Sequence, residues 1–437
     1  MAGIFLLAGL SPIHGATKPP LKWSKPFINV SSIRPSAIVQ DRLYCQADGV
    51  SAVLTVWTNG AVLGTIANES GFCVDDDRTL YVRRGSRITA LDQANTVLWG
   101  YNLWRGAANL GPILGPRNHT ILSLSYESGD LERKLYLVKL STTGEPSLYN
   151  QIGYMASAAS TNNLAFSQIA VSPNGRVYVV VDSVLNAFDS DGNLLWKYTL
   201  YELENSTPAI DAAGVIYAQA RQAVVAIDAN GRTKWRNDVS PFASFVNYDS
   251  PPVFARDRLF VSWLDRVYCF DRSGSVLWQK SIPNATQPRV AADGTVYLVA
   301  GGALRCLDSL GVEQWRFSPV TSPAVLGDDG AIYVANDNVL YVLDGAAKGP
   351  HPWPMDGGGA GRRNVGAGVG IPSATITNGQ FILRIAAEGV TNGILESSGD
   401  LRIWNAVTNY DVTFERAFLD RDASNSASRF FRLREGR

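Results

Sequence analysis

Short apolar runs separated by turn residues recur along the middle of the chain, and they predict antiparallel strands. Several runs carry an aromatic residue at the same place in the pattern: TLYV (Tyr81), RVYVV (Tyr178), VIYAQ (Tyr217), RLFVS (Phe260), TVYLV (Tyr297) and AIYV (Tyr333). Runs rich in β-branched and aromatic residues, bounded by Gly, Pro, Asn and Asp, are typical of strands. No stretch shows sustained helical periodicity. The pattern therefore indicates an all-β protein.

A second element follows these strands at a fixed distance. In each copy Asp is followed by Gly three residues later and by Trp four residues after that: Asp189, Gly192 and Trp196; Asp228, Gly231 and Trp235; Asp271, Gly274 and Trp278; Asp308, Gly311 and Trp315. A further copy has Asp92 and Trp99, with Asn95 in place of Gly. Gly and Asn both tolerate the left-handed backbone of a tight turn. One unit is therefore an antiparallel meander of four strands.

Weaker copies extend the repeat in both directions. Trp57 and Gly60 mark one of them, Ser141, Gly144 and Leu148 mark another, and Asp344 begins the last. The anchors at 57, 92, 141, 189, 228, 271, 308 and 344 give eight units with a mean spacing of about 41 residues. Four-stranded units of this length predict an eight-bladed β-propeller, in which each blade buries its faces against its neighbours. A solenoid is the alternative, but its units usually contain helices or fewer strands.

The chain divides into a ring and a smaller C-terminal piece. Residues 21–27 (LKWSKPF) look like the Trp-containing strand that ends a unit, and the last unit lacks such a strand because prolines follow Asp344. We therefore expect residues 21–27 to complete the last blade of a propeller that spans residues 17–356. Residues 357–371 form a Gly-rich linker, and residues 372–437 contain short strands that predict a small β-sandwich-like domain.

The N-terminus predicts export. Residues Gly3 to Leu10 form an apolar run that is much shorter than the roughly 20 residues needed to cross a bilayer. Residues 1–16 therefore indicate a secretory signal peptide, with cleavage after Ala16, and not a membrane span. An apolar N-terminal strand is the alternative, because no Lys or Arg precedes the run. The protein is expected in the periplasm, outside the cell or on the cell surface of a bacterium.

Composition limits the possible partners. The chain has 39 Lys plus Arg and 39 Asp plus Glu, a formal net charge of 0, and 46% hydrophobic residues. A balanced charge argues against nucleic acid as a partner, because that partner requires a basic face. Only 3 His are present, which leaves little room for a His-rich metal site. A large apolar core remains compatible with all of these numbers.

The Asp-x-x-Gly-x-x-x-Trp turn with its upstream Gly-x-x-Tyr resembles the repeat of the pyrroloquinoline-quinone (PQQ) type propellers. The resemblance covers roughly residues 20 to 365 and includes a closing Trp-Pro-Met segment at Trp353. It implies eight blades with tryptophans docked between them. The family contains quinoprotein dehydrogenases and also scaffolds, such as the propeller subunit of the outer-membrane protein assembly machinery. The C-terminal piece, through Ser397 to Leu401 and Trp404, resembles a module of exported proteins from environmental bacteria.

The repeat residues have structural and chemical interpretations. The tryptophans could stack on a flat ligand, but one per blade at one place favours packing between blades. The aspartates could bind Ca²⁺, but the bidentate Glu of a calcium loop is missing, which favours hydrogen bonds within the turn. The quinoprotein enzymes carry an adjacent Cys pair over the quinone, and this chain has none. We therefore assign no catalytic or metal-binding residue and expect neither PQQ nor Ca²⁺ as a cofactor.

The chain has four cysteines, Cys45, Cys73, Cys269 and Cys306, without a Cys-x-x-Cys motif. Cys269 and Cys306 occupy equivalent positions in successive units, so a disulfide between them and two buried free thiols both remain open. Candidate binding residues lie where the repeat is least regular: Trp104, Arg105, Tyr126, Tyr248 and Asp249. Flat apolar faces beside hydrogen-bonding groups suit a protein or a sugar. Variation of loops without a function is the alternative.

These patterns favour a non-catalytic binding or assembly scaffold over an enzyme. The scaffold would hold a protein, peptide or glycan at one face of the propeller. The alternative is a divergent enzyme with its site in the central funnel, either a quinone-dependent dehydrogenase or an enzyme acting on polysaccharide. The propeller fold by itself does not decide between them.

Overall fold

The computed structural model describes residues 19–349 with short gaps, and the backbone of strands between residues 368 and 435. The gaps are residues 49–51, 68–70, 76, 104–111, 116–119, 129–131, 157–166, 173, 182, 200–205, 212, 221–222, 239–249 and 264. The elements in this part of the chain are all strands. No helix found there is long and apolar enough to cross a bilayer.

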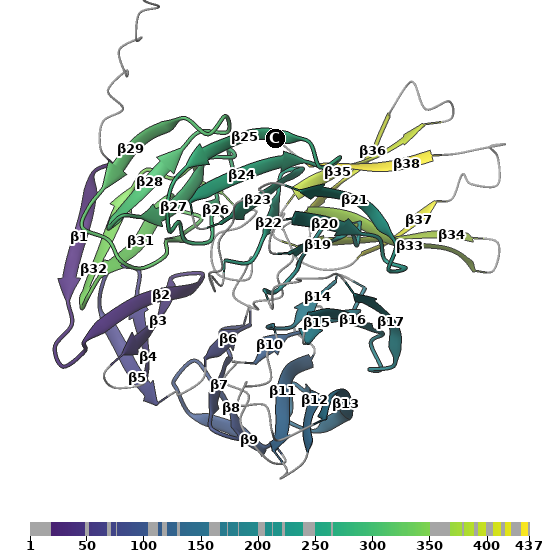
Figure 1. Cartoon of the computed structure of the whole chain (residues 1–437), viewed down its shortest axis with the longest axis horizontal. Coiled ribbons are helices and arrows are strands. Elements are labelled where there is room, and N and C mark those ends of the chain that lie inside the picture. Colours follow the sequence, from purple (N-terminus) through teal and green to yellow (C-terminus); the bar gives the residue numbers. More distant parts are fainter. Residues whose placement is uncertain are drawn as a thin grey trace, which may run out of the picture.

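Eight four-stranded antiparallel sheets follow one another around a ring (Figure 1). Blades 1 to 4 contain, in order along each sheet, β2 (Ser32–Val39), β3 (Arg42–Asp48), β4 (Ala52–Trp57) and β5 (Val62–Ala67); β6 (Phe72–Val74), β7 (Leu80–Arg84), β8 (Arg87–Leu91) and β9 (Val97–Asn102); β10 (Ile113–Leu114), β11 (Thr120–Ser128), β12 (Glu132–Ser141) and β13 (Pro146–Ala156); β14 (Ala170–Val171), β15 (Val177–Val181), β16 (Val184–Phe188) and β17 (Leu194–Thr199).

Blades 5 to 8 contain β18 (Ala209–Ile210), β19 (Ile216–Gln219), β20 (Ala223–Ile227) and β21 (Thr233–Asp238); β22 (Val253–Ala255), β23 (Arg258–Ser262), β24 (Arg266–Asp271) and β25 (Val276–Ser281); β26 (Arg289–Val290), β27 (Val296–Ala300), β28 (Ala303–Leu307) and β29 (Glu313–Phe317); β30 (Val325–Leu326), β31 (Ala331–Asn336), β32 (Val339–Asp344) and β1 (Leu21–Pro26). This architecture confirms the predicted eight-bladed propeller.

The two ends of the ring meet in the eighth blade. β1 pairs antiparallel with β32, so that Trp23 lies opposite Val342 and Pro26 opposite Val339. Beyond the strands, the Phe27 backbone N–H donates to the Asn338 carbonyl at 2.9 Å. The Asn338 side-chain amide returns a bond to the Phe27 carbonyl at 2.8 Å. The first strand of the ring is therefore the outer strand of its last blade.

Burial changes in a regular way across each blade. Middle strands such as β15, β20 and β27 are buried along their whole length, because other blades cover both of their faces. The outer strands β1, β9, β17, β21 and β25 share one alternating pattern with two exposed residues first and a half-buried Trp third. Each outer strand therefore offers one large side chain to the neighbouring blade.

That Trp docks on the Asp-x-x-Gly turn of the next blade. The indole N–H of Trp99, Trp196, Trp235 and Trp278 donates to the carbonyl of Thr142 (2.7 Å), Ala229 (3.0 Å), Arg272 (2.8 Å) and Ser309 (3.2 Å), respectively. The same four rings lie, in that order, against Gly144, Gly231, Gly274 and Gly311, where an added Cβ would come within 2.6 to 2.8 Å of ring carbons. These glycines also have φ between 77° and 87°. The position therefore requires Gly for backbone conformation and for space.

The interface between blades 7 and 8 departs from this contact on one side. Gly311 receives the ring of Trp278 from blade 6, but Trp315 has no equivalent turn to dock on, because Ala347 stands three residues after Asp344. Trp315 instead packs on Tyr297 of its own blade, with 5.8 Å between ring centroids. Tyr297 donates its hydroxyl to the Gly345 carbonyl at 3.1 Å, the position that an indole N–H would take. Trp315 therefore keeps the place of the repeat Trp without its hydrogen bond to the next blade.

The ring closes with a looser version of the same contact. Trp23 of β1 lies against Gly60 of blade 1, where an added Cβ would come within 3.4 Å of the indole ring. Lys25 adds a bond from its ammonium group to the Gly60 carbonyl at 2.7 Å. The last blade is thereby tied to the first through the strand that completes it.

The other departures from the repeat keep the contact filled. Leu148 stands in for Trp in blade 3 and lies against Gly192. Blade 1 has Gly64 where Trp is expected, and the facing turn of blade 2 has Asn95 where Gly is expected. A Cβ on Gly64 would lie 2.7 Å from the Asn95 amide nitrogen. The large and the small residue have exchanged sides of this interface.

Cationic side chains form a second set of bonds between blades. They donate to the carbonyl of the residue after the repeat Asp, or after its substitute, in the next blade: Arg42 to Gln93 (2.7 Å), Lys139 to Ser190 (2.8 Å), Arg176 to Ala229 (2.6 Å) and Arg258 to Ser309. The sequence analysis missed these residues. The signal was Arg two residues before the strand aromatic, as at Arg42, Arg176 and Arg258.

The C-terminal strands form two three-stranded antiparallel sheets. One contains β33 (Gly368–Thr377), β34 (Gln380–Glu388) and β37 (Arg416–Asp420), and the other contains β36 (Asn405–Asp411), β35 (Asn392–Ser398) and β38 (Phe430–Glu435). The boundaries predicted for the signal peptide, the linker and this domain fall outside the described residues or are not tested by the structure.

We expect Gly231→Ala to destabilise the protein more than Gly214→Ala. Both glycines have positive φ, 82° and 79°. A Cβ at Gly231 would come within 2.8 Å of Trp196, whereas nothing lies within 4 Å of one at Gly214. Gly214→Ala therefore adds only backbone strain, and Gly231→Ala adds overpacking of about 1–3 kcal/mol. Denaturant midpoints measure the difference, and equal effects would show that Trp docking is slack.

We also expect Gly64→Trp and Asn95→Gly to rescue each other. Gly64→Trp alone collides with Asn95, and Asn95→Gly alone leaves the space beside Gly64 empty. Together they restore the Trp-on-Gly contact of the other blades, with a favourable coupling of about 1–3 kcal/mol. A double-mutant cycle of thermal or denaturant unfolding measures this coupling. Additive effects would contradict the exchange of large and small residues.

Candidate binding site

The alternation of strand direction divides the turns of the propeller between two faces. The turn face carries the Asp-x-x-Gly turns and the turns between the first two strands of each blade. The connection face carries the turns between the second and third strands and the links from one blade to the next. Turns on the turn face are short, because each is closed by its own hydrogen bonds. Long insertions in the sequence fall on the connection face.

The candidate binding residues cannot be assembled into a site. Trp104 and Arg105 fall between β9 and β10, and Tyr248 and Asp249 fall between β21 and β22, all outside the described residues. Tyr126 belongs to β11, where its backbone pairs with Leu135, but its side chain is not described. The strand ends that flank both links lie on the connection face. A binding role for these five residues stays a prediction.

The repeat aspartates are engaged within their own turns. One carboxylate oxygen of each accepts the backbone N–H groups two and four residues later, at 2.8 to 2.9 Å, in Asp92, Asp189, Asp228, Asp271 and Asp308. These bonds lower the pKa of Asp228, and bonds from Asn193 lower that of Asp189 in the same way. The described residues contain no group of three or more His, Cys, Asp or Glu side chains that could hold a metal ion.

Two blades carry a buried carboxyl in the turn between their first two strands. Asp75 accepts a bond from the Tyr81 hydroxyl at 3.1 Å, and Asp211 accepts one from Tyr217 at 3.2 Å. Burial raises the pKa of both carboxyls. Arg272, 4.0 Å from Asp211, opposes part of that rise. In these blades the turn and the strand aromatic are therefore tied together.

Buried polar groups also fasten blades near the connection face. Arg83 is fully buried and donates to the Leu124 carbonyl at 2.6 Å and to the Ser123 hydroxyl at 3.1 Å in blade 3. Burial lowers the pKa of Arg83 to about 10. Arg289 is likewise buried and donates from Nε to the Ala324 carbonyl in blade 8 at 2.9 Å. These arginines act between blades.

The four cysteines are buried free thiols. Cys269 and Cys306 belong to different packed clusters, one around blades 5 to 7 and one around blades 7 and 8. Burial raises the pKa of each of these two thiols to about 12. Because the thiolate is the reactive form, neither is suited to nucleophilic or redox chemistry in the folded ring.

Blade 6 breaks the repeat on the turn face. Blades 4, 5 and 7 join their first two strands through residues 172–176, 211–215 and 291–295, whereas β22 and β23 are joined by Arg256 and Asp257 alone. Both residues have positive φ, 51° and 61°. Such a two-residue turn favours Asn-Gly, so Arg-Asp is a strained choice.

Blade 1 has an equally short turn but differs from blade 6 in two respects. Its turn residues are Gln40 and Asp41, of which Gln40 has positive φ, 55°. Blade 1 also keeps the strand Tyr, as Tyr44, at the position where blade 6 has Phe260. Blade 6 therefore combines a charged, doubly strained turn with the loss of the strand hydroxyl.

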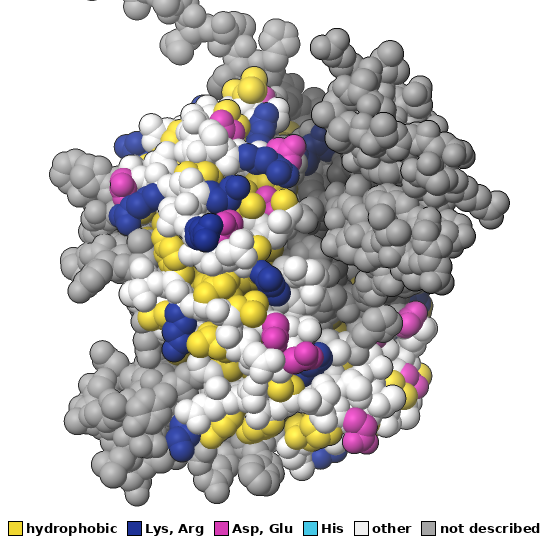
Figure 2. Space-filling model, turned by 90° about the vertical axis from the view of Figure 1, so that its right-hand side faces the viewer, with side chains coloured by type: hydrophobic (Ala, Val, Ile, Leu, Met, Phe, Trp, Pro, Cys, Tyr) yellow, Lys and Arg dark blue, Asp and Glu magenta, His cyan; other side chains and the backbone are white. Residues whose placement is uncertain are grey.

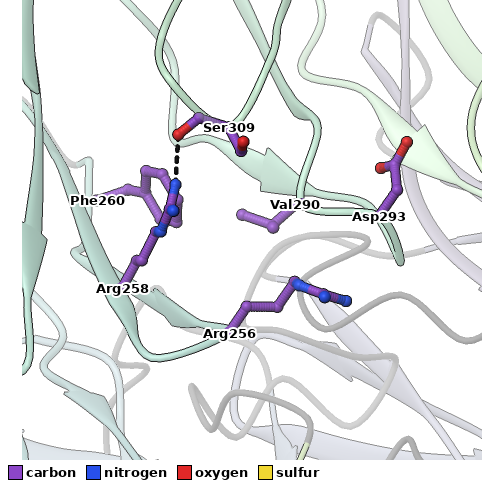
Figure 3. A pocket seen from close by; sticks show the side chains of 7 residues that line it. Arg256, Arg258, Phe260, Val290, Asp293 and Ser309 are labelled. Atoms are coloured by element: carbon purple, nitrogen blue, oxygen red, sulfur yellow. Dashed lines mark hydrogen bonds between the residues drawn. The ribbon is translucent and has the colours of Figure 1, made fainter. Parts of the chain in front are cut away.

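A pocket lies beside this short turn, between blades 6 and 7 (Figure 3). Its volume is about 260 Å³, and it is lined by Arg256, Arg258, Phe260, Val290, Asp293, Gly294 and Ser309. Phe260 and Val290 are buried and form the apolar part of the lining. Arg256 and Asp293 are exposed, and Arg258 is half-buried. The pocket therefore combines an apolar floor with charged groups at its opening.

The pocket has more positive than negative charge. Arg258 donates to the Ser309 carbonyl, and Arg256 donates to the Ala292 carbonyl in blade 7. Within the described part of the chain, neither guanidinium forms an ion pair. Asp293 is the acidic residue of the lining. One net positive charge remains at this site.

The surface around the ring has no matching large field. On the side drawn in Figure 2, Lys and Arg side chains are interspersed with Asp and Glu and with apolar groups. Exposed apolar residues such as Val97, Leu98, Val276 and Leu277 belong to the outer strands. A mixed surface gives little long-range steering, so recognition depends on local sites such as the pocket.

The comparisons with known proteins agree with this architecture. A family model described as "Outer membrane protein assembly factor BamB", of the PQQ-repeat type, matches residues 157–263 and 264–408. These matches cover more than half of the chain, which therefore belongs to this family of PQQ-repeat propellers. The resemblance seen in the sequence is confirmed. No curated protein sequence matches the chain.

Solved structures share the fold at low sequence identity. BamB from Moraxella catarrhalis has a TM-score of 0.55 and 15% identity, covering 75% of this chain and 98% of that one. Virginiamycin B lyase from Staphylococcus aureus has a TM-score of 0.43 and 10% identity, covering 74% and 98%. The Dos1 propeller has a TM-score of 0.49 and 12% identity, covering 76% and 96%.

We expect the double substitution Arg256→Asn and Asp257→Gly to stabilise the protein. It replaces two residues at positive φ by the pair that this turn prefers, for a gain of about 1 kcal/mol. The exposed Asp257–Arg272 ion pair (2.7 Å) is lost, but such pairs contribute little. Thermal unfolding measures the result. Asp257→Gly alone is the control, and a fall in stability for the double variant would show that the turn is not strained.

Proposed function

We propose that this protein is an exported, non-catalytic scaffold that holds a protein partner at one face of the propeller. Membership of a family whose model is named for an outer-membrane protein assembly factor supports a partner of this kind. A peptide or glycan partner belongs to the same proposal, because each would be held by the turns of one face. The apolar run of residues 3–10 supports export.

The closed, pairwise-docked ring is the observation that carries the proposal. Trp, Leu or Asn fills the contact between neighbouring outer strands and turns, and cationic side chains add bonds across the same interfaces. Turns mounted on such a ring keep fixed relative positions before a partner arrives. Preorganisation reduces the entropy lost on binding, which is the property an assembly scaffold requires.

Photo-crosslinking from each face tests the proposal. A benzophenone amino acid is placed at Leu310 on the turn face and, in a second variant, at Ile28 on the connection face, both of which are exposed. We expect one face to give a discrete protein adduct in the cells that make the protein. Val97 on an outer strand serves as the control position. Absence of a face-specific adduct from both probes would contradict a scaffold role.

The enzyme alternative is tested on the same preparation. PQQ and Ca²⁺ are titrated into the purified protein, and absorbance and thermal melting are followed. Saturable binding with a raised melting temperature would support a quinone-dependent enzyme in place of the scaffold. We expect no change with both ligands in large excess.

A further inference from the structure

The pocket between blades 6 and 7 exists because blade 6 departs from the repeat in two ways. The shortened turn removes residues that would cover it, and Phe260 lacks the hydroxyl that the other blades place nearby. In blade 7 the equivalent Tyr297 hydroxyl donates to the Gly345 carbonyl of blade 8 at 3.1 Å. At the next interface back, the matching carbonyl belongs to Ser309, and Arg258 reaches it instead. The space that a Tyr hydroxyl would use is left to the pocket.

The two arginines of the pocket differ in what the repeat explains. Arg258 has counterparts in Arg42 and Arg176, which bond the same carbonyl position in other blade pairs. Arg256 belongs to the strained two-residue turn, and the matching position of blade 1 holds the uncharged Gln40. Strain retained at the edge of a pocket points to a requirement for the side chain that causes it.

We propose that this pocket binds the carboxylate of an acidic side chain of the protein partner, with Arg256 and Arg258 as its cationic lining; this inference rests on the proposed function. Guanidinium groups pair with carboxylates through parallel N–H bonds. The Phe260 and Val290 floor suits the methylene groups that carry the carboxylate. A volume of about 260 Å³ lies below the range for drug-sized ligands and suits a single side chain.

Asp293 decides between a carboxylate and a phosphate. Its charge leaves the pocket with one net positive charge, which a single carboxylate balances. A phosphate group carries a charge nearer to two and would meet repulsion from Asp293. Both guanidinium groups donate to backbone carbonyls of blade 7 rather than to Asp293, so the negative charge stays at the exposed edge of the pocket.

A matched pair of peptides tests the proposal on the full chain. The probes are acetyl-Gly-Val-Glu-Val-Gly-amide and the same peptide with Gln in place of Glu, and binding is followed through the valine methyl signals by ligand-observed NMR. We expect the Glu peptide to bind at least about tenfold more tightly than the Gln peptide. Equal binding, or no binding of the Glu peptide up to about 10 mM, overturns the proposal.

Variants locate the effect. Arg256→Ala is expected to reduce binding of the Glu peptide to the level of the Gln peptide, and Arg266→Ala, in the same blade on the connection face, is expected to leave it unchanged. Arg258→Ala is compared with Arg176→Ala, which removes the same kind of bond between blades away from the pocket. Equal losses in Arg256→Ala and Arg266→Ala would overturn the assignment.

Asp293→Asn gives a readout that a structural role of the arginines would not move. An Asn keeps the oxygen that accepts the Thr295 backbone N–H at 2.9 Å and removes the negative charge. We expect tighter binding of the Glu peptide, by about threefold to tenfold, and measurable competition by inorganic phosphate. Unchanged affinity would contradict the charge balance proposed for the pocket.

The outcomes separate this inference from the proposed function. A protein adduct from Leu310 together with equal binding of the two peptides would keep the scaffold and remove the carboxylate site. Selective binding of the Glu peptide without any protein adduct would keep the carboxylate site and remove the scaffold. The stabilised variant Arg256→Asn with Asp257→Gly is expected to lose the Glu peptide while remaining folded.

Discussion

The docking of one large side chain on a glycine of the next blade is the contact on which the ring depends. A blade by itself has two faces to bury and an outer strand with unpaired backbone groups. Trp235 and its equivalents cover the neighbouring turn, and the facing Gly274 has both the positive φ and the missing Cβ that the contact needs. The indole N–H then satisfies a carbonyl of that turn. Apolar burial, backbone conformation and hydrogen bonding therefore meet at one residue pair in each regular interface.

The architecture was predictable from sequence because this contact leaves a strong mark on it. Asp, Gly and Trp at fixed spacing define a turn, its left-handed position and its docking partner, so eight weak copies add up to one reliable pattern. Two positions show the limit of such a prediction. Gly64 looks like a loss of the motif although Asn95 fills its interface, and Trp315 looks regular although the turn that it faces lacks the Gly. Contacts that cross between units are not written within one unit.

The candidate site was harder to predict for a related reason. The sequence analysis looked for long insertions, which drew attention to Trp104, Tyr126 and Tyr248. The pocket described here arises from a shortening, since blade 6 has two residues where blades 4, 5 and 7 have a longer turn. Shortening adds no unusual residues to notice, and Arg256 looks like an ordinary surface arginine. Its backbone conformation, which marks it as a retained oddity, becomes visible only in three dimensions.

The pairing of β1 with β32 gives the ring a single closing seam. The two strands are separated by more than 300 residues, as the Phe27–Asn338 bonds show, and closing a loop of that length costs about 5 kcal/mol of chain entropy. The strand made first during synthesis must wait for a partner that is made last. Until then β32 is an open sheet edge, and the nascent propeller is a curved array with exposed ends. Detaching a single outer strand would return the finished ring to that state, so its resistance to opening is concentrated in one short segment.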